Sequence, residues 1–152
     1  MARAPFQVLA LPWRRTGPGV FAFAMFQRSD SACWQGIAGG GEGDETPLDA
    51  ARREAYEEAG IRPDSSFLPL QTITSIRVSE FASTHHWGSD RYVVPEHAFG
   101  VDANGQSITL SREHTTYRWL PYEEAHLLLT WDGNRTALWE LHRRLLGRGP
   151  RD

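Results

Sequence analysis

The sequence has little of several features that would place a protein in a class at once. Its single cysteine, Cys33, cannot form a disulfide within one chain, so nothing ties the protein to an oxidising compartment. No apolar run approaches the roughly 20 residues of a membrane helix, because the longest candidate, residues 20–26, has the length of a strand. The amino terminus lacks the long apolar segment of a secretory signal. We therefore expect a cytoplasmic protein without a membrane partner.

An excess of basic residues is also missing. The chain has 16 Lys and Arg against 19 Asp and Glu, for a net charge of −3 at pH 7. A surface that coats DNA or RNA is usually strongly basic, so we expect no nucleic-acid polymer as a partner, although a local site can still hold a nucleotide. The length of 152 residues predicts one domain, residues 1–147, with a flexible tail over 148–152. Its oligomeric state is open between a monomer and a homodimer.

Hydrophobic periodicity predicts short strands around a central helix, followed by two late helices. The expected strands are residues 6–11, 20–26, 68–78, 92–101, 106–110 and 115–120, and the late helices begin near residues 121 and 134. Asn104-Gly105 stands between two of these strands and predicts a tight hairpin, because both central residues of such a turn need positive φ. The glycine-rich segment 39–44 is expected to be a loop. This mixture predicts an α+β fold, with a mixed sheet between helical layers.

The boundaries of the central helix can be predicted from its capping residues. Thr46 suits the N-cap position, Pro47 the first helical position, and Asp49 the acid of a capping box. Gly60 suits the position just past the carboxyl end. Residues 47–59 should therefore form a helix that follows directly on the glycine-rich segment.

Three acids share one face of this helix. At about 100° per residue, Glu54, Glu57 and Glu58 fall within an arc of roughly 100°, beside a stripe of small apolar residues. Acidic helix faces are most often simply solvated, and Arg52 and Arg53 could screen these charges. Carboxylates one helical turn apart can also hold Mg²⁺ or Mn²⁺ jointly, because these hard cations prefer oxygen ligands. The helix alone does not decide between the two interpretations.

The wider spacing does decide. The chain contains Gly39-x5-Glu45-x7-Arg53-Glu54-Ala55-x-Glu57-Glu58-x-Gly60-Ile61. This pattern resembles the Nudix box, the signature of hydrolases that act on nucleoside diphosphates linked to another moiety. All nine constrained positions match, and a chance match is on the order of 10⁻⁹ per starting position.

The resemblance implies an α/β/α sandwich and a metal-dependent hydrolysis. Carried onto this chain, it assigns Glu54 and Glu58 as the main ligands of Mg²⁺, for which Mn²⁺ can substitute, and Glu57 as a further ligand. Arg53 is similar to the arginine that orients a glutamate of the box. The implied reaction is attack of water on a bridging phosphorus, with cation electrostatics and positioning supplying most of the catalysis.

Looser matches outside the box resemble one Nudix subgroup. They are residues 26–30, 33–36, 113–120 and 131–135. The subgroup includes the bacterial dihydroneopterin triphosphate pyrophosphatases, also described as dATP pyrophosphohydrolases. There, a glutamate ahead of a strand supplies a distal metal ligand, and Glu113 occupies the matching place. The alternative for Glu113 is a surface loop acid. The catalytic set that the resemblance implies is Arg53, Glu54, Glu57, Glu58 and Glu113.

Four further residues are candidates for substrate binding. Arg28 follows an apolar strand and can bind a phosphate through charge-assisted contacts, or it is a solvated strand end. Trp34 can stack on a base or pterin ring, or it belongs to the core. By the resemblance, Gly39 is the residue whose backbone lets the preceding strand turn beside the metals, and Gly40 next to it is a further candidate for substrate binding. Residues 81–95 match nothing in the subgroup and are expected to shape substrate choice.

The function expected from these features is that of a pyrophosphohydrolase for a small molecule that resembles a nucleoside triphosphate, either dihydroneopterin triphosphate or a dNTP such as dATP. The box does not exclude dinucleoside polyphosphates, ADP-ribose, nucleotide sugars or oxidised nucleotides as substrates. A nucleotide-sensing module without turnover is a further alternative. The general base is open among Glu57, Glu113 and a neighbouring histidine.

Overall fold

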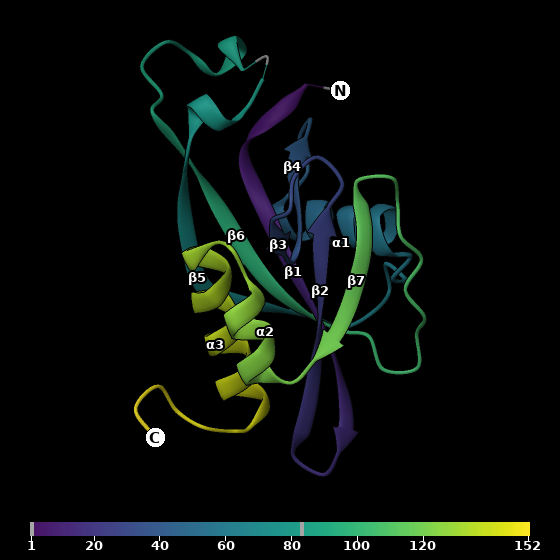
Figure 1. Cartoon of the computed structure of the whole chain (residues 1–152). Coiled ribbons are helices and arrows are strands. Elements are labelled where there is room, and N and C mark those ends of the chain that lie inside the picture. Colours follow the sequence, from purple (N-terminus) through teal and green to yellow (C-terminus); the bar gives the residue numbers. More distant parts are fainter. Residues whose placement is uncertain (1, 83) are drawn as a thin grey trace.

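The structure, a computed structural model, describes residues 2–82 and 84–152. These residues form seven strands, three α-helices and two short 3-10 helices (Figure 1). Their bounds are β1 Arg3–Gly17, β2 Val20–Arg28, β3 Trp34–Gln35, β4 Ile37–Glu42, α1 Pro47–Ala59, β5 Phe67–Arg77, η1 Val78–Glu80, η2 His85–Trp87, β6 Val93–Asp102, β7 His114–Leu120, α2 Tyr122–Leu128 and α3 Asp132–Leu145. None of the helices in this part of the chain is long and apolar enough to cross a membrane.

The sheet is mixed, as predicted, and β1 is its central strand. The strand order is β3-β2-β1-β6-β5, with β4 paired to β1 and β7 paired to β2. One edge of β1 pairs antiparallel with β4 through its first half and with β2 through its second half. The other edge pairs parallel with β6. Because β1 changes partner along its length, it holds both halves of the sheet together.

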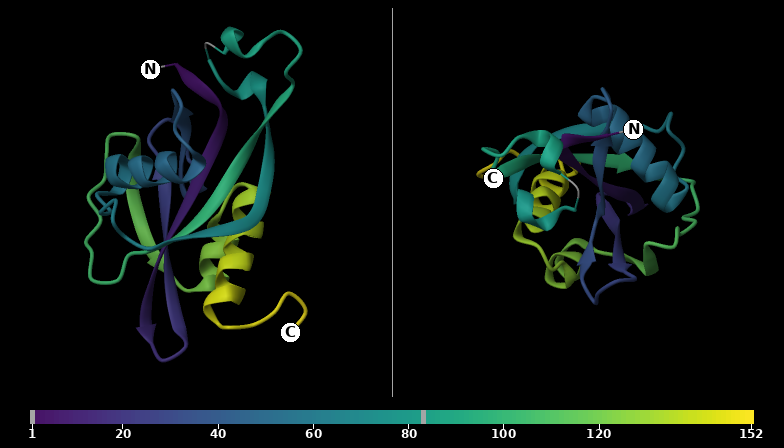
Figure 2. Two further views of the ribbon diagram at one scale, coloured as in Figure 1. Left: turned by 180° about the vertical axis from the view of Figure 1, so that it is seen from behind. Right: turned by 90° about the horizontal axis from the view of Figure 1, so that it is seen from above.

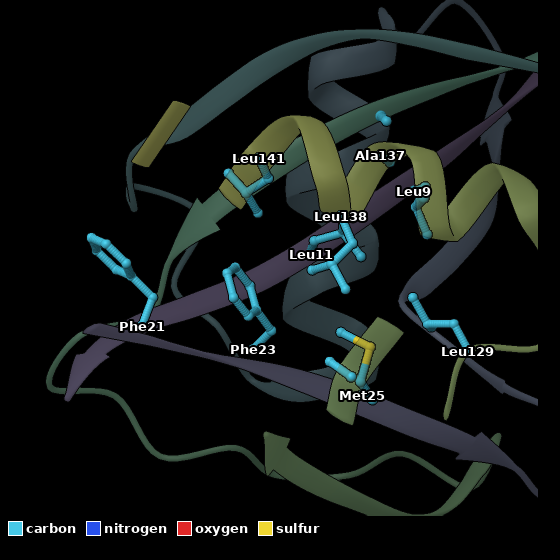
Figure 3. Close-up of a cluster of buried hydrophobic side chains, with 11 residues drawn as sticks. Leu9, Leu11, Phe21, Phe23, Met25, Leu129, Ala137, Leu138 and Leu141 are labelled. Carbon is cyan, nitrogen blue, oxygen red and sulfur yellow. The ribbon is translucent and has the colours of Figure 1, made fainter. Parts of the chain in front are cut away.

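The helices α2 and α3 cover one face of the sheet. Leu9 and Leu11 of β1 and Phe23 of β2 are buried in this cluster against Leu138 and Leu141 of α3 (Figure 3). The spacing of three residues between these two leucines places both on one side of the helix, as the sequence predicted. Burial of this apolar surface fixes α3 against the sheet and places its first turn beside the ends of the strands.

The helix α1 covers the opposite face. Figure 2 shows it in front of the sheet when the molecule is seen from behind. Val8 and Ala10 of β1 alternate with the leucines of the other core and contact this side, because successive side chains of a strand point to opposite faces. The helix contributes Ala51 and Ala55, whose small side chains are fully buried. An α/β/α arrangement with one helix behind the sheet and two in front is the result.

The bounds predicted for α1 are confirmed. Thr46 and Asp49 form the expected reciprocal capping box, with both hydrogen bonds at 3.2 Å. Gly60 has φ of 70° and ends the helix in the left-handed conformation that glycine adopts without steric cost. The other helices and the strands predicted at 20–26, 68–78 and 115–120 differ from the structure by only a few residues.

The hairpin predicted around Asn104-Gly105 is wrong. Gly105 has φ of 73°, but residues 106–110 form no strand. Their backbone pairs instead with the end of α1, since the amide of Thr109 donates to the carbonyl of Ala59 at 2.9 Å. Asn104 accepts a hydrogen bond from the amide of Arg15 on the neighbouring strand. Asn104-Gly105 therefore does form a turn, but the residues after it pair with the end of α1 and not with a strand of the sheet.

The glycine-rich segment is only partly a loop. Gly39 and Gly40 lie within β4, where they pair with Val8 and Gln7 of β1. The loop before α1 is confined to residues 43–46. Glycine usually destabilises the interior of a strand. Here it leaves room for other side chains to approach the backbone, Glu54 at Gly39 and Arg3 at Gly40.

Between β5 and β6, the described residues 78–82 and 84–92 make an excursion at the top of Figure 1. It contacts the beginning of β1. The ring nitrogen Nε1 of Trp87 donates to the carbonyl of Arg3 at 2.8 Å, and Nε2 of His86 lies 2.8 Å from the same oxygen. The guanidinium of Arg3 lies over the ring of Phe81, 5.2 Å from its centroid. These contacts place the excursion beside the first residues of β1.

Candidate active site

Arg53 organises the acidic side of α1. Its guanidinium donates to Glu45 through Nε at 2.8 Å, and to Glu54 and Glu57 through Nη1 at 2.9 and 3.2 Å. Nη2 donates to the carbonyl of Gly40 at 2.8 Å. The planar fork of arginine suits such divided contacts. Arg53 therefore ties the helix to β4 and fixes the orientation of the Glu54 carboxylate.

Glu54 is buried between α1 and β4. Its exposed fraction is 9%, and a Cβ atom added at Gly39 would lie 2.1 Å from its Cδ. Only glycine leaves room for the carboxylate at this point. Burial raises the pKa of Glu54 to about 7, Arg53 opposes this rise, and the nearby charges of Glu58 and Glu57 add to it. The carboxylate is thus held where a further positive charge would stabilise its ionised form.

Glu58 lies one helical turn away in a different environment. Its exposed fraction is 5%, and the hydroxyl of Ser111 donates to Oε2 at 2.6 Å. The Nδ1 atom of His114 lies 3.4 Å from the same oxygen. Burial raises the pKa of Glu58, and the charge of Glu113 adds to this rise. Ser111 just before β7 therefore positions Glu58 as Arg53 positions Glu54, with His114, the first residue of β7, beside it.

The His114 ring is buried without a hydrogen-bond partner at either nitrogen among the residues that the structure describes. It packs beside the ring of Phe26, with 5.3 Å between the centroids. Burial lowers the pKa of His114, so the ring is neutral at physiological pH. A neutral imidazole beside Glu58 neither pairs with the acid as a cation nor reaches the solvent.

No three His, Cys, Asp or Glu side chains within residues 2–82 and 84–152 converge in an arrangement that would hold a metal ion. Arg53 lies between Glu54 and Glu57, and Ser111 holds Glu58 on the other side. The donor set fits a hard dication by its chemistry, because Mg²⁺ takes one or two protein carboxylates and completes its shell with water and phosphate. Two buried carboxylates with raised pKa values, next to a strand without side chains at Gly39, meet that requirement.

A cavity of about 950 Å³ opens beside these acids, and we call it the central cavity. Glu54, Gly39, Arg28 and Glu113 line it at one end. It continues over the sheet to residues of β1, β5 and β6 and to the first turn of α3. Its volume lies within the range of pockets for small molecules. The cavity therefore extends from Glu54 of α1 to residues of three strands and of α3.

The predicted site residues fall into two groups. Those that line the central cavity are Arg28, Gly39, Gly40, Glu54 and Glu113. Arg53, Glu57 and Glu58 are not among its lining residues, and the side chain of Glu57 is half exposed. Arg28 is held by Asp30 through two hydrogen bonds of 2.7 Å. Trp34 lies elsewhere, because it packs against the core, and Trp131 lines the cavity instead.

Sequence reasoning missed three polar residues at the site, Ser111, His114 and Glu96. Ser111 and His114 lie on either side of Arg112-Glu113, so the segment 111–114 at the start of β7 carries the signal that was assigned to one acid. Glu96 lies between Pro95 and His97 in β6, and an acid within a largely buried strand is itself unusual. The unusual acid was visible in the sequence, but its neighbours along the chain do not indicate that Glu96 lines the central cavity.

The comparisons with known proteins agree with this geometry. The family model described as NUDIX domain matches residues 6–141. The solved structure of a Listeria monocytogenes protein assigned to the NUDIX hydrolases is 40% identical, with 95% of this chain and 96% of that chain covered and a TM-score of 0.85. No curated protein matches the sequence.

Two more distant structures share the fold. The Escherichia coli dihydroneopterin triphosphate pyrophosphohydrolase is 24% identical, over 93% of this chain and 97% of its own, with a TM-score of 0.74. A Caenorhabditis elegans Ap4A hydrolase in a binary complex is 19% identical, over 95% and 99%, with a TM-score of 0.69. Relatives named for different substrates thus share one architecture, and the architecture does not select among those substrates.

Proposed function

Because this chain belongs to the Nudix family of hydrolases, we propose that it cleaves a small molecule that resembles a nucleoside triphosphate, to a monophosphate and pyrophosphate. Dihydroneopterin triphosphate and dNTPs such as dATP are the proposed substrates. The observation that carries the proposal is the central cavity, which is lined by the carboxylate of Glu54 and by residues of β1, β5, β6 and the first turn of α3, and whose volume of about 950 Å³ suits a small molecule. Such a shape suits a substrate with phosphates at one end and a heterocycle at the other.

We propose that Glu54 and Glu58 hold Mg²⁺, with Mn²⁺ able to substitute, and that Glu57 and Glu113 assist. A divalent cation supplies neutralisation of phosphate charge and a water of lowered pKa. The burial of Glu54 and Glu58 supports their role, since both pKa values are raised by the loss of solvent and by neighbouring acids. Bringing the four acids together requires rotation of side chains that Arg53 and Ser111 now hold.

The remaining residues position the reactants. Arg53 holds Glu54 against β4, and Ser111 does the same for Glu58. Arg28 lies at the phosphate end of the cavity and can exchange Asp30 for a phosphate, which offers the same bidentate contact. Glu113 is the best-placed general base, because it lines the cavity whereas His114 is buried. Its proposed task is to accept the proton of the attacking water.

The test is a panel of substrates assayed with Mg²⁺ and with the products identified. We expect pyrophosphate from dNTPs and dihydroneopterin triphosphate, and a fall in kcat of about a hundredfold or more in Glu58→Gln. Glu124→Gln on the exposed side of α2 is the matched control and should keep full activity. Full activity in Glu58→Gln would overturn the proposed catalytic centre.

The product pattern also separates the alternatives. Release of two monophosphates from ADP-ribose, or preferential cleavage of a dinucleoside polyphosphate, would replace the proposed substrate class without changing the catalytic centre. Tight nucleotide binding with no hydrolysis under any divalent metal would favour a sensing module.

A further inference from the structure

We propose that Glu96 and Gln7 recognise the ring of the substrate, and that this ring presents an N–H next to an amino group, as the 2-amino-4-oxo edge of guanine and of pterins does. The proposal rests on the proposed function for the position of the phosphates, which are expected at the Glu54 end of the central cavity. It goes beyond that function because it assigns the ring subsite and selects among the possible rings.

The subsite is a row of residues that crosses four strands. In the sheet register, Gly40 of β4 pairs with Gln7 of β1, Gln7 pairs with Glu96 of β6, and Glu96 pairs with Thr74 of β5. All four residues line the central cavity. Paired residues in neighbouring strands project from the same face of a sheet, so the row forms one continuous surface. The first turn of α3 covers it from the side, since a Cβ at Gly133 would lie 2.3 Å from Oγ1 of Thr74.

Glu96 is an acid without a cationic partner. Its exposed fraction is 6%, and among the described residues no arginine or histidine forms an ion pair with it. Val94 and Ala98, two residues away on the same face, are buried. Burial raises the pKa of Glu96 to about 7, and Gln7 opposes this rise only in part. An acid in this position is costly unless something donates hydrogen bonds to it.

The pair of side chains matches one pattern of ring edge. An ionised Glu96 offers two acceptor oxygens, and the amide of Gln7 offers a donor beside them. Guanine and pterins present a carbonyl, a ring N–H and an amino group in that order, so each group of the ring finds its complement. Thymine and uracil place a second carbonyl where the amino group stands, which would face the carboxylate. Adenine and cytosine place a ring acceptor next to their amino group and satisfy only one oxygen.

The test compares dGTP with dITP, whose ring differs only by the missing 2-amino group. With Mg²⁺ and the full chain, we expect kcat/KM for dGTP to exceed that for dITP by about tenfold or more, because a hydrogen bond to a charged acceptor is lost. In Glu96→Gln the ratio should fall below about threefold. Glu80→Gln is the matched control, since Glu80 lies at the rim of the same cavity and pairs with Arg77 at 2.9 Å. It should keep the ratio of the unaltered protein.

Gln7→Ala is the second variant and keeps the test decisive if Glu96→Gln does not fold. It should lower kcat/KM for dGTP and dITP by similar factors and leave their ratio near that of the unaltered protein. Equal kcat/KM for dGTP and dITP in the unaltered protein would overturn the proposal. A ratio that Glu96→Gln leaves unchanged would overturn it as well.

A binding measurement separates this proposal from the proposed function. If no triphosphate is hydrolysed, the proposed function fails, and titration calorimetry of dGMP and dIMP then tests the ring subsite by itself. Tighter binding of dGMP by about tenfold, lost in Glu96→Gln, would support the subsite without the activity. Equal binding of the two nucleotides would reject the subsite.

Discussion

Two buried glutamates line the same cavity, and burial raises the pKa of each to about 7. Their neighbours differ. Glu54 is hydrogen-bonded to Arg53 at 2.9 Å and stands near two further acids. Glu96 forms no ion pair among the described residues, and the side chain that favours its ionised form is the neutral Gln7. The raised pKa therefore has a different consequence at each glutamate. At Glu54, several negative charges surround one guanidinium, which agrees with the cation that we propose there. At Glu96, a single charge lacks solvent, and neutral hydrogen-bond donors suffice.

The largest expected effect comes from removing the charge at Glu54. Glu54→Gln should lower kcat by about a hundredfold or more for dGTP and dITP alike, because a group that acts on the phosphates cannot distinguish the rings. Steady-state kinetics on both substrates measures this, with the exposed Glu123→Gln of α2 as the control. A loss confined to one of the two substrates would contradict the division of roles between Glu54 and Glu96.

A substitution at Gly39 in β4 would fill the space beside the Glu54 carboxylate. In Gly39→Ala the new Cβ would lie 2.1 Å from Cδ of Glu54, which Arg53 holds in place. We expect kcat to fall by at least about tenfold, since small displacements of catalytic groups are costly. Gly40→Ala is the control, because its Cβ would meet only the movable end of Arg3 at 2.9 Å. Equal losses in the two variants would show that Glu54 has room to move.

The lone charge of Glu96 is expected to cost stability at high pH. Its pKa is about 7 in the folded protein and 4.5 without burial. The folded state therefore binds the proton more tightly, and this contribution is fully present below pH 4.5 and lost as the pH rises through 7. Glu96→Gln should raise the free energy of unfolding by up to about 3 kcal/mol at pH 8 and by less than about 1 kcal/mol at pH 5.

Urea denaturation at the two pH values measures this difference. Arg3, Arg77 and Glu80 line the same cavity and are present in both proteins, so the comparison changes only the side chain at position 96. Glu80→Gln should show no comparable change between pH 5 and pH 8. An effect of Glu96→Gln that is the same at both pH values would mean that Glu96 is not held in an environment that favours its neutral form.

The smallest expected effect concerns the support of Glu54 rather than the acid itself. Thr46→Ala removes the side chain that accepts a hydrogen bond from Asp49 at the start of α1, and should lower the free energy of unfolding by about 1 kcal/mol. Thermal unfolding measures this, with Thr116→Ala on the exposed side of β7 as the control. An unchanged Tm would show that the capping hydrogen bond of Thr46 contributes nothing measurable and that packing alone stabilises α1.

The sequence predicted α1 to the residue because its signals are local. Thr46, Asp49 and Gly60 act within one turn of the helix ends, so tertiary structure has little to override. The mixed sheet was also predictable, since apolar periodicity marks most of its strands and the capping signals mark the helix between them. Both features could be predicted without knowledge of which strands become neighbours.

What the sequence did not predict depends on contacts between distant segments. Residues 106–110 were expected to form a strand, but the carbonyls at the end of α1 offered them partners that no local signal reveals. The row that contains Gln7 and Glu96 joins residues almost ninety positions apart, and only the register of β1 against β6 brings them together. The motif therefore locates the phosphate chemistry, while the ring subsite becomes visible only in the folded chain.

The change of partner along β1 has a consequence for how such a protein can vary. Gln7 and Trp13 belong to one uninterrupted strand, which is in register with β4, β6 and β2 at the same time. An insertion of one residue between them would turn every side chain on one flank to the opposite face. We expect natural length variation in relatives to avoid this strand and to gather in the turn after Gly17 and in the segment between β5 and β6. Substrate range can then diversify by changes in loop length, while the spacing inside β1 stays constant.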